Sequence, residues 1–236
     1  MSQVREACAP AAQVISAIAS IEIPIGKWDN IINILLGQID QQQLLVKESI
    51  LRCLGFICQD IPNSEYLEQH SNLILTAVVS GITNQESLQV RLAAMIALSN
   101  SLIFAKKNMD IQQERDYIMT VICQTIRNNE HEVKLHAYMC LILIAENYYR
   151  HLQPYMEEIY QITSAQLISA QQDGDSEEIC LAIEFWSTIC DREIDYKNQQ
   201  IELWEKGCME EEFKQNRSSK KAGPIRQAGP QKLQEV

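Results

Sequence analysis

The sequence predicts an all-α fold in which pairs of helices stack into a right-handed α-solenoid. Two observations lead to this prediction. A hydrophobic pattern recurs along the chain at a nearly constant interval, which is typical of proteins built from stacked structural repeats. The composition also favours helix over sheet, since the 236 residues include only 8 Gly and 6 Pro and are 46% apolar.

The repeat has a period of 43 to 45 residues. The fifth positions of its four copies are Ile50, Ala94, Ala137 and Ala182, which lie 44, 43 and 45 residues apart. A period of this length is typical of HEAT-type repeats, in which helix A, a turn and helix B form one unit. The four copies of the pattern occupy residues 46–54, 90–98, 133–141 and 178–186.

Each period contains two amphipathic segments separated by a short polar turn. A leading B helix is expected over residues 3–19, and Pro24 follows it as a stop signal. Turn residues such as Asn84 and Gly174 fall where the period requires a break. The helical pairs that follow are expected at 28–36 with 44–59, 64–82 with 87–104, 111–127 with 131–149, and 152–169 with 177–191.

The pattern divides the chain into three regions. Residues 1–195 are expected to form the HEAT-repeat solenoid, with about four full repeats after a leading half repeat. Residues 196–216 depart from the repeat and form an acidic segment compatible with helix. Residues 217–236 contain Gly223-Pro224 and Gly229-Pro230, so a disordered basic tail is expected there. No polar capping repeat is visible, and the chain is therefore expected to be an internal slice of a longer solenoid.

Charge and cysteine usage restrict the partners and the compartment. The formal net charge of −11 disfavours nucleic acid as a ligand and suits basic protein segments. The most apolar stretch, residues 11–25, is interrupted by polar side chains, so neither a signal peptide nor membrane insertion is expected. The eight cysteines form no C-x-x-C pair and are expected to be reduced core thiols in the cytosol or nucleus.

The sequence offers no catalytic or metal-binding pattern. His131 and His136 are five residues apart, which places them about 140° apart around a helix, whereas the zinc-protease motif needs histidines four apart. Cys53 and Cys58 have the same spacing and fail as a ligand pair for the same reason. No phosphate-binding glycine loop is present. We therefore expect a protein that is not an enzyme and that uses no cofactor and no metal.

Six strings in the chain go beyond periodicity. One is Gly55-Phe56-Ile57-Cys58-Gln59-Asp60-Ile61, another is Ile183-Glu184-Phe185-Trp186-Ser187-Thr188-Ile189-Cys190-Asp191, and the others occupy 19–24, 71–77, 100–104 and 114–119. In this order they resemble the importin-beta family of nuclear-transport receptors, the karyopherin beta family. The resemblance covers about residues 2–195, corresponds to the third to seventh HEAT repeats of the family, and ends after Asp195.

The resemblance implies a pocket between two A helices that binds a Phe side chain of FG nucleoporins. Positions i and i+4 share one helical face, so the placement is physically consistent. The same apolar positions are equally compatible with packing into the neighbouring repeat, and this alternative stays open. Tyr117 and Val79 stand where the family more often has Phe and Ile. The family's pocket positions fall on Leu75, Thr76 and Val79 of the first helix and on Glu114, Tyr117 and Ile118 of the second.

The resemblance also implies partners and a location. The outer A helices would bind FG-repeat nucleoporins, and the inner B helices would hold cargo proteins with basic segments during protein import into the nucleus. Ran-GTP contacts would be weakened because the first two repeats and a later acidic loop are missing, and importin alpha is not expected to bind this fragment. The expected location is the cytoplasm and nucleus, and the nuclear envelope at pores.

Two other functions remain compatible with the sequence. A HEAT-repeat scaffold that organises an unrelated protein complex would show the same periodicity. A truncated, non-functional receptor fragment would show the same resemblance. Selective binding of FG segments separates the transport function from both.

Overall fold

The computed structural model describes residues 2–221 except 40–42, 63, 128–129 and 174–175, and these residues form helices without any strand. The all-α prediction is confirmed. The α-helices are α1 (Ser2–Glu22), α2 (Ile31–Leu36), α3 (Leu44–Asp60), α4 (Glu65–Ile82), α5 (Leu88–Ser101), α6 (Lys106–Asp110), α7 (Gln112–Arg127), α8 (His131–Tyr148), α9 (Met156–Asp173) and α10 (Ser176–Lys221). Three 3-10 helices lie between them: η1 (Leu102–Phe104), η2 (Tyr149–His151) and η3 (Gln153–Tyr155).

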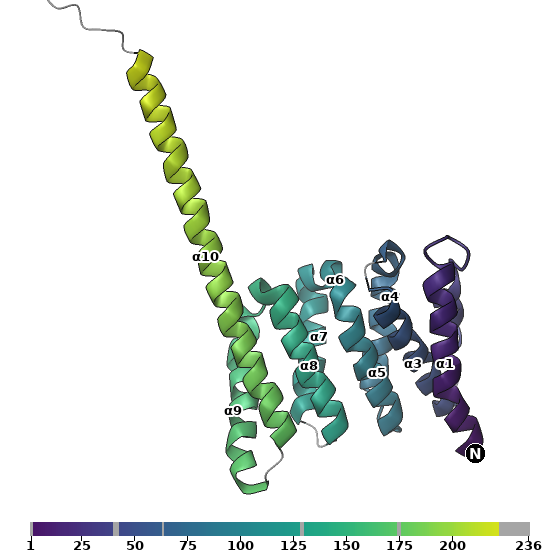
Figure 1. Cartoon of the computed structure of the whole chain (residues 1–236). Coiled ribbons are helices and arrows are strands. Elements are labelled where there is room, and N and C mark those ends of the chain that lie inside the picture. The colour runs from purple at the N-terminus through teal and green to yellow at the C-terminus, as the bar shows by residue number, and fades with distance from the viewer. Residues whose placement is uncertain (1, 40–42, 63, 128–129, 174–175, 222–236) are drawn as a thin grey trace, which may run out of the picture. The chain divides into compact units, whose positions relative to one another are not determined.

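The chain forms two units, residues 1–192 and 193–236. In the first unit, A helices alternate with B helices along the chain (Figure 1). The B helices α1, α3, α5 and α8 contact one another extensively in chain order, whereas neighbouring A helices touch at few positions. Space is therefore left between the A helices of successive repeats. The A helices are α2, α4, α7 and α9, and the B helices are α1, α3, α5, α8 and the first part of α10.

Small residues allow the B helices to approach closely. A Cβ atom built on Gly55 of α3 would lie 3.3 Å from the Cα of Ala97 in α5. The Asn100 side chain of α5 donates a hydrogen bond to the Gly55 carbonyl oxygen at 3.0 Å. Gly81 of α4 is more tightly enclosed, because an added Cβ would lie 2.8 Å from both Ala94 Cβ and Leu51 Cδ1. These contacts fix the spacing of α3, α4 and α5.

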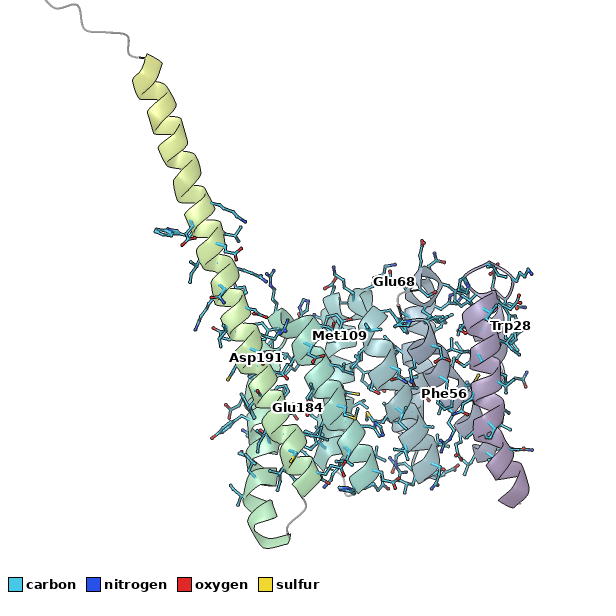
Figure 2. All side chains as sticks on the ribbon, in the orientation of Figure 1. Trp28, Phe56, Glu68, Met109, Glu184 and Asp191 are labelled. Atoms are coloured by element: carbon cyan, nitrogen blue, oxygen red, sulfur yellow. The ribbon has the colours of Figure 1, made fainter. Side chains whose placement is uncertain are left out.

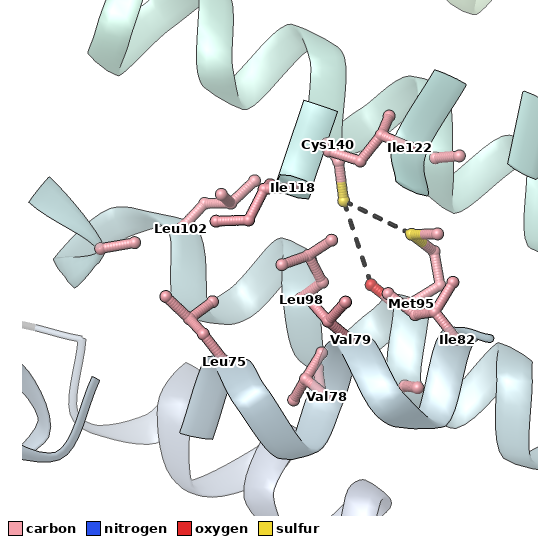
Figure 3. Packing of buried hydrophobic residues seen from close by; sticks show 14 of the residues in the cluster. Leu75, Val78, Val79, Ile82, Met95, Leu98, Leu102, Ile118, Ile122 and Cys140 are labelled. Carbon is pink, nitrogen blue, oxygen red and sulfur yellow. Dashed lines mark hydrogen bonds between the residues drawn. The ribbon is translucent and has the colours of Figure 1, made fainter. Parts of the chain in front are cut away.

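The hydrophobic core runs continuously through the first unit, where side chains of adjacent helices fill the space between the ribbons (Figure 2). Polar bonds join successive B helices within it. Cys140 Sγ of α8 lies 3.8 Å from Met95 Sδ of α5 (Figure 3). The Tyr148 hydroxyl donates a hydrogen bond to the carbonyl oxygen of Leu102, one repeat earlier.

The cysteines are divided between the core and the surface. Cys53, Cys58, Cys123 and Cys140 are buried, as expected for core thiols, and they are free. The prediction was wrong for Cys180 and Cys190, which are exposed, because they lie on α10, where no further repeat covers that part of the helix among the described residues. The Cys208 side chain lies outside the described residues. Burial raises the pKa of Cys53 and Cys123 to about 12.

Several helix boundaries differ from the expected ones, including those of α9, which spans Met156–Asp173 rather than 152–169. Helix α2 begins at Ile31 rather than at residue 28, and a short helix, α6, occupies part of a segment expected as a loop. Helix α10 continues to Lys221, five residues into the segment expected to be a disordered tail. The first Gly-Pro pair of that segment is Gly223-Pro224, so nothing in residues 217–221 breaks a helix. Residues 222–236 lie outside the described part of the chain.

Within the part of the chain that the structure describes, none of the helices combines the length and the apolarity needed to cross a bilayer.

Candidate functional site

The predicted pocket residues lie on two adjacent A helices. Leu75, Thr76 and Val79 are on α4, Tyr117 and Ile118 are on α7, and Glu114 is in the first turn of α7; α4 contacts α7 directly. The two helices that carry the six residues are therefore neighbours. The six side chains, however, differ strongly in exposure.

Three of the six side chains belong to the core. Leu75, Val79 and Ile118 are at most 4% exposed and pack in one cluster with Leu98 and Leu102 (Figure 3). Leu102 belongs to η1, which contacts α4. These residues form an apolar floor rather than an open surface.

The other three side chains are polar or aromatic and more exposed. Tyr117 is 57% exposed on the outer side of α7. The Thr76 hydroxyl donates a hydrogen bond to the Asn72 carbonyl oxygen at 2.7 Å, within its own helix. The Glu114 carboxylate accepts a hydrogen bond from the Asn108 side chain of α6 at 2.6 Å. Helix α6 thus orients the start of α7. Tyr117 of α7 is exposed and can contact a partner.

The rotation of α7 is fixed from its opposite side. Arg115 donates a hydrogen bond to the Met109 carbonyl oxygen at 2.6 Å and another to the Tyr155 hydroxyl at 3.2 Å. Tyr155 in turn donates to the Asp116 carboxylate. Burial, followed by the hydrogen bond to Asp116, raises the pKa of Tyr155. Because Arg115 and Asp116 bind toward the next repeat, Tyr117 points to solvent.

The loose packing of the A layer produces three grooves, one between each successive pair of A helices. The α2–α4 groove has a volume of about 310 Å³, the α4–α7 groove about 400 Å³ and the α7–α9 groove about 390 Å³. Of the six predicted residues, Thr76 lines a groove, and it lines the one between α2 and α4 rather than the one between α4 and α7. The grooves lie near the ends of the A helices and reach the first turn of the following B helix.

A basic residue lines each groove from the first turn of a B helix. These residues are Lys47 of α3, Arg91 of α5 and Lys134 of α8, which are 44 and 43 residues apart. Arg91 pairs through two nitrogens with Glu130, the residue before α8, and donates to the Asn84 carbonyl oxygen at 2.8 Å. Lys134 Nζ lies 3.5 Å from the Glu178 carboxylate of α10.

The sequence patterns did not indicate these inter-repeat ion pairs. The signal that could have found them is the repeat itself, since the three cations occupy one position of it. Glu178 is buried, and it also lies 2.9 Å from His131 Nδ1. Each pair joins the start of one B helix to the start of the next. In the described ranges, no group of three His, Cys, Asp or Glu side chains could hold a metal ion.

Comparison with known proteins agrees with this architecture. A family model described as IPO5-like, TPR repeats matches residues 2–162. The chain belongs to the importin-beta family. It is 41% identical over 186 residues to importin subunit beta-1 of Arabidopsis thaliana, and 41% identical over 189 residues to that of Saccharomyces cerevisiae. Each alignment covers 78% of this chain, which spans only about a fifth of the length of these importin-beta relatives.

Solved structures of the family show the same fold. Yeast importin-beta, Kap95p, superposes with a TM-score of 0.73 at 35% identity, over 86% of this chain and 25% of that one. Kap95 in complex with Nup1 gives 0.71 at 39% identity, over 82% and 23% of the two chains. Kap95p bound to RanGDP gives 0.70 at 38% identity, over 81% and 22%. The helical-pair solenoid predicted from the period is that of importin-beta.

Proposed function

We propose that this importin-beta chain acts in protein import into the nucleus and binds FG nucleoporins on its A helices. Its relatives are importin beta-1 subunits, and a structural neighbour is Kap95 in complex with Nup1. The chain spans only part of those proteins, so the proposal concerns the repeats present here. The cytoplasm, the nucleus and the nuclear envelope at pores are the locations that follow from it.

The observation that carries the proposal is the seam between α4 and α7. Leu75, Val79 and Ile118 are buried apolar residues of α4 and α7, and Tyr117 of α7 is an exposed aromatic side chain. An aromatic ring placed against another in edge or offset geometry contributes about 0.5–1.5 kcal/mol beyond its area burial. A Phe ring of an FG segment would gain this contact from Tyr117.

The binding is expected to be weak at each site. One ring covers far less area than a stable protein interface requires. A flexible chain with many FG motifs would supply avidity by engaging several seams, because the second contact is made at a high effective concentration. Weak single contacts would also allow rapid exchange between motifs.

The B helices are the proposed surface for cargo. They expose carboxylates at Asp60, Glu132, Glu146 and Glu184, which would attract basic protein segments. Ran is a further proposed partner because Kap95p binds RanGDP.

The experiment compares binding of the purified chain to an immobilised FG-repeat segment and to its Phe→Ser version. Acidic substitutions at Val79 or Ile118 would place an unpaired charge in the core and disturb folding. Tyr117→Ala avoids this problem, because the side chain is exposed. Tyr196→Ala, at an exposed tyrosine of α10, is the matched control.

We expect the wild type to bind the FG segment and not the Phe→Ser segment. Tyr117→Ala should weaken binding about three- to tenfold, as loss of one aromatic contact implies, while Tyr196→Ala should bind like the wild type. Circular dichroism would confirm that all proteins are equally helical. Equal binding to the Phe and Ser segments would eliminate the FG role, and an equal loss in both tyrosine variants would remove the α4–α7 seam as its site.

A further inference from the structure

The α2–α4 groove differs from the other two in its charge balance. In the α4–α7 groove Arg91 is bound by Glu130, and in the α7–α9 groove Lys134 is bound by Glu178. Both carboxylates come from the start of the next B helix. At the start of α5 the corresponding N-cap residue is Ser87, whose hydroxyl accepts a hydrogen bond from the Val90 backbone N–H. A neutral side chain thus stands at the repeat position of Glu130, and Val90 stands at the repeat position of Glu178.

Lys47 is therefore the exception among the three cations. Among the residues that the structure describes, no carboxylate forms an ion pair with its ammonium group. The side chain is half-buried at the edge of the groove. An ammonium group in this position keeps its full capacity to bind a carboxylate from outside the chain.

The walls of this groove are the most apolar of the three. Leu36 and Ile39 line it from the α2 side and Leu51 lies beneath it. Leu73, which is 49% exposed, and Ala77 form the α4 wall. A volume of about 310 Å³ is at the lower end of the range for small-ligand sites, so the groove suits one large side chain rather than a folded surface.

We propose that the α2–α4 groove binds a partner peptide in which a large aliphatic side chain is followed directly by a carboxylate. The aliphatic side chain fills the space between Leu36 and Leu73, and the carboxylate pairs with Lys47. In this way the partner supplies the acid that Glu130 and Glu178 supply within the chain. The proposal is independent of the FG contact at the α4–α7 seam, since it involves a different groove and a different residue chemistry.

The net charge of the chain does not oppose this contact at close range. The formal charge of −11 repels an acidic peptide at long distance, but at physiological salt such repulsion is screened beyond about 8 Å. The Lys47 contact acts within that length. The charge does predict that the peptide associates slowly at low salt and that its affinity is best measured near physiological ionic strength.

The test uses the whole chain and the peptide acetyl-Gly-Ser-Leu-Asp-Ser-Gly-amide. Methyl NMR signals of Leu36 and Leu73 report whether the leucine enters the groove, and their titration gives the dissociation constant. Two peptide controls replace Leu by Ser or Asp by Asn. The protein variants are Lys47→Gln and the matched control Lys106→Gln, at an exposed lysine of α6.

We expect shifts at Leu36 and Leu73 with the Leu-Asp peptide and none with the Ser-Asp peptide. Lys47→Gln should weaken binding about two- to fivefold, the range for a partly exposed ion pair, and Lys106→Gln should leave it unchanged. The Asp→Asn peptide should show the same loss on the wild type and no further loss on Lys47→Gln. Unmoved Leu36 and Leu73 signals, or equal affinity for the Asp and Asn peptides, would overturn the proposal.

Discussion

The close approach of three helices at Gly81 gives a sharp test of the packing. A side chain at this position would enter the space between α3 and α5, where an added Cβ already lies 2.8 Å from Ala94 Cβ and from Leu51 Cδ1. Both neighbours are at most 1% exposed, so neither can move into solvent. Gly81→Val places two further methyl groups in the same space.

The expected cost follows from two opposing effects. Overpacking a well-filled core costs up to about 3 kcal/mol. Replacing Gly by Val in a helix returns about 0.3 kcal/mol of helix propensity. We therefore expect Gly81→Val to lower the free energy of unfolding by about 2–3 kcal/mol. For a chain of this length, that corresponds to a decrease in Tm of roughly 5 to 10 °C.

The assay is thermal unfolding followed by circular dichroism, with Gly207→Val as the control. A Cβ at Gly207 of α10 would meet nothing within 4 Å, so this variant should show no decrease in Tm. Adding Ala94→Gly to Gly81→Val removes one of the two overlaps, and the double variant should lose less stability than the sum of its single changes. An unchanged Tm for Gly81→Val, or strict additivity with Ala94→Gly, would refute the packing argument.

Two further predictions concern the ionisable groups. Burial raises the pKa of Cys53 and Cys123 from the ordinary value of 9.0 to about 12 in the folded chain. As the pH rises, these thiols therefore ionise first in the unfolded chain. The free energy of unfolding that they contribute is fully present below pH 9 and falls by about 1.4 kcal/mol per pH unit for each thiol up to about pH 12. Urea unfolding midpoints at pH 8 and pH 10 measure this loss of stability. Cys123→Ala should reduce the difference between the two midpoints. Equal midpoints in the wild type would contradict the prediction. Glu130→Gln should lower the free energy of unfolding, measured with urea, by about 1 kcal/mol because it breaks the two-nitrogen contact with Arg91. Glu158 pairs with Arg127 at a more exposed position, so Glu158→Gln should cost at most about half as much. The reverse order would argue against the Arg91 pair as a link between repeats.

The repeat period predicted the helical pairs well because it reflects burial, which dominates the fold. The copies at Ile50, Ala94, Ala137 and Ala182 are all buried residues of B helices. Apolar positions that return every 43 to 45 residues can be buried together only if successive helical pairs stack. The fold class follows from that single requirement.

The helix starts could not be predicted as well, because tertiary contacts fix them. Helix α2 begins at Ile31, where the Tyr66 hydroxyl of the next A helix accepts from the Ile32 backbone N–H at 3.5 Å and donates to the Asp29 carbonyl oxygen at 2.9 Å. Helix α6 has only five residues, too few to show a helical period. Its buried Met109 and Asn108 hold it in place.

The exposure of the candidate site residues could not be predicted from the sequence. The spacing of Leu75 and Val79 places them on one face of α4, and that face does lie at the seam with α7. Whether they meet solvent depends on Leu98 and Leu102, which belong to other elements of the structure and cover them. The orientation of Tyr117 likewise depends on the bonds of Arg115 and Asp116 to the next repeat, which no local pattern reports.

The hydrogen bonds between successive repeats have a consequence for how the chain folds. Arg91 to Glu130, Asn100 to Gly55 and Tyr148 to Leu102 join residues 39, 45 and 46 positions apart. Every such contact closes a loop of about one period, so the entropy of closure is similar for each repeat and does not grow with the number already folded. Folding can start at any helical pair and spread to its neighbours. Hydrogen exchange should accordingly show seams that open one at a time while the adjoining pairs keep their amide protection.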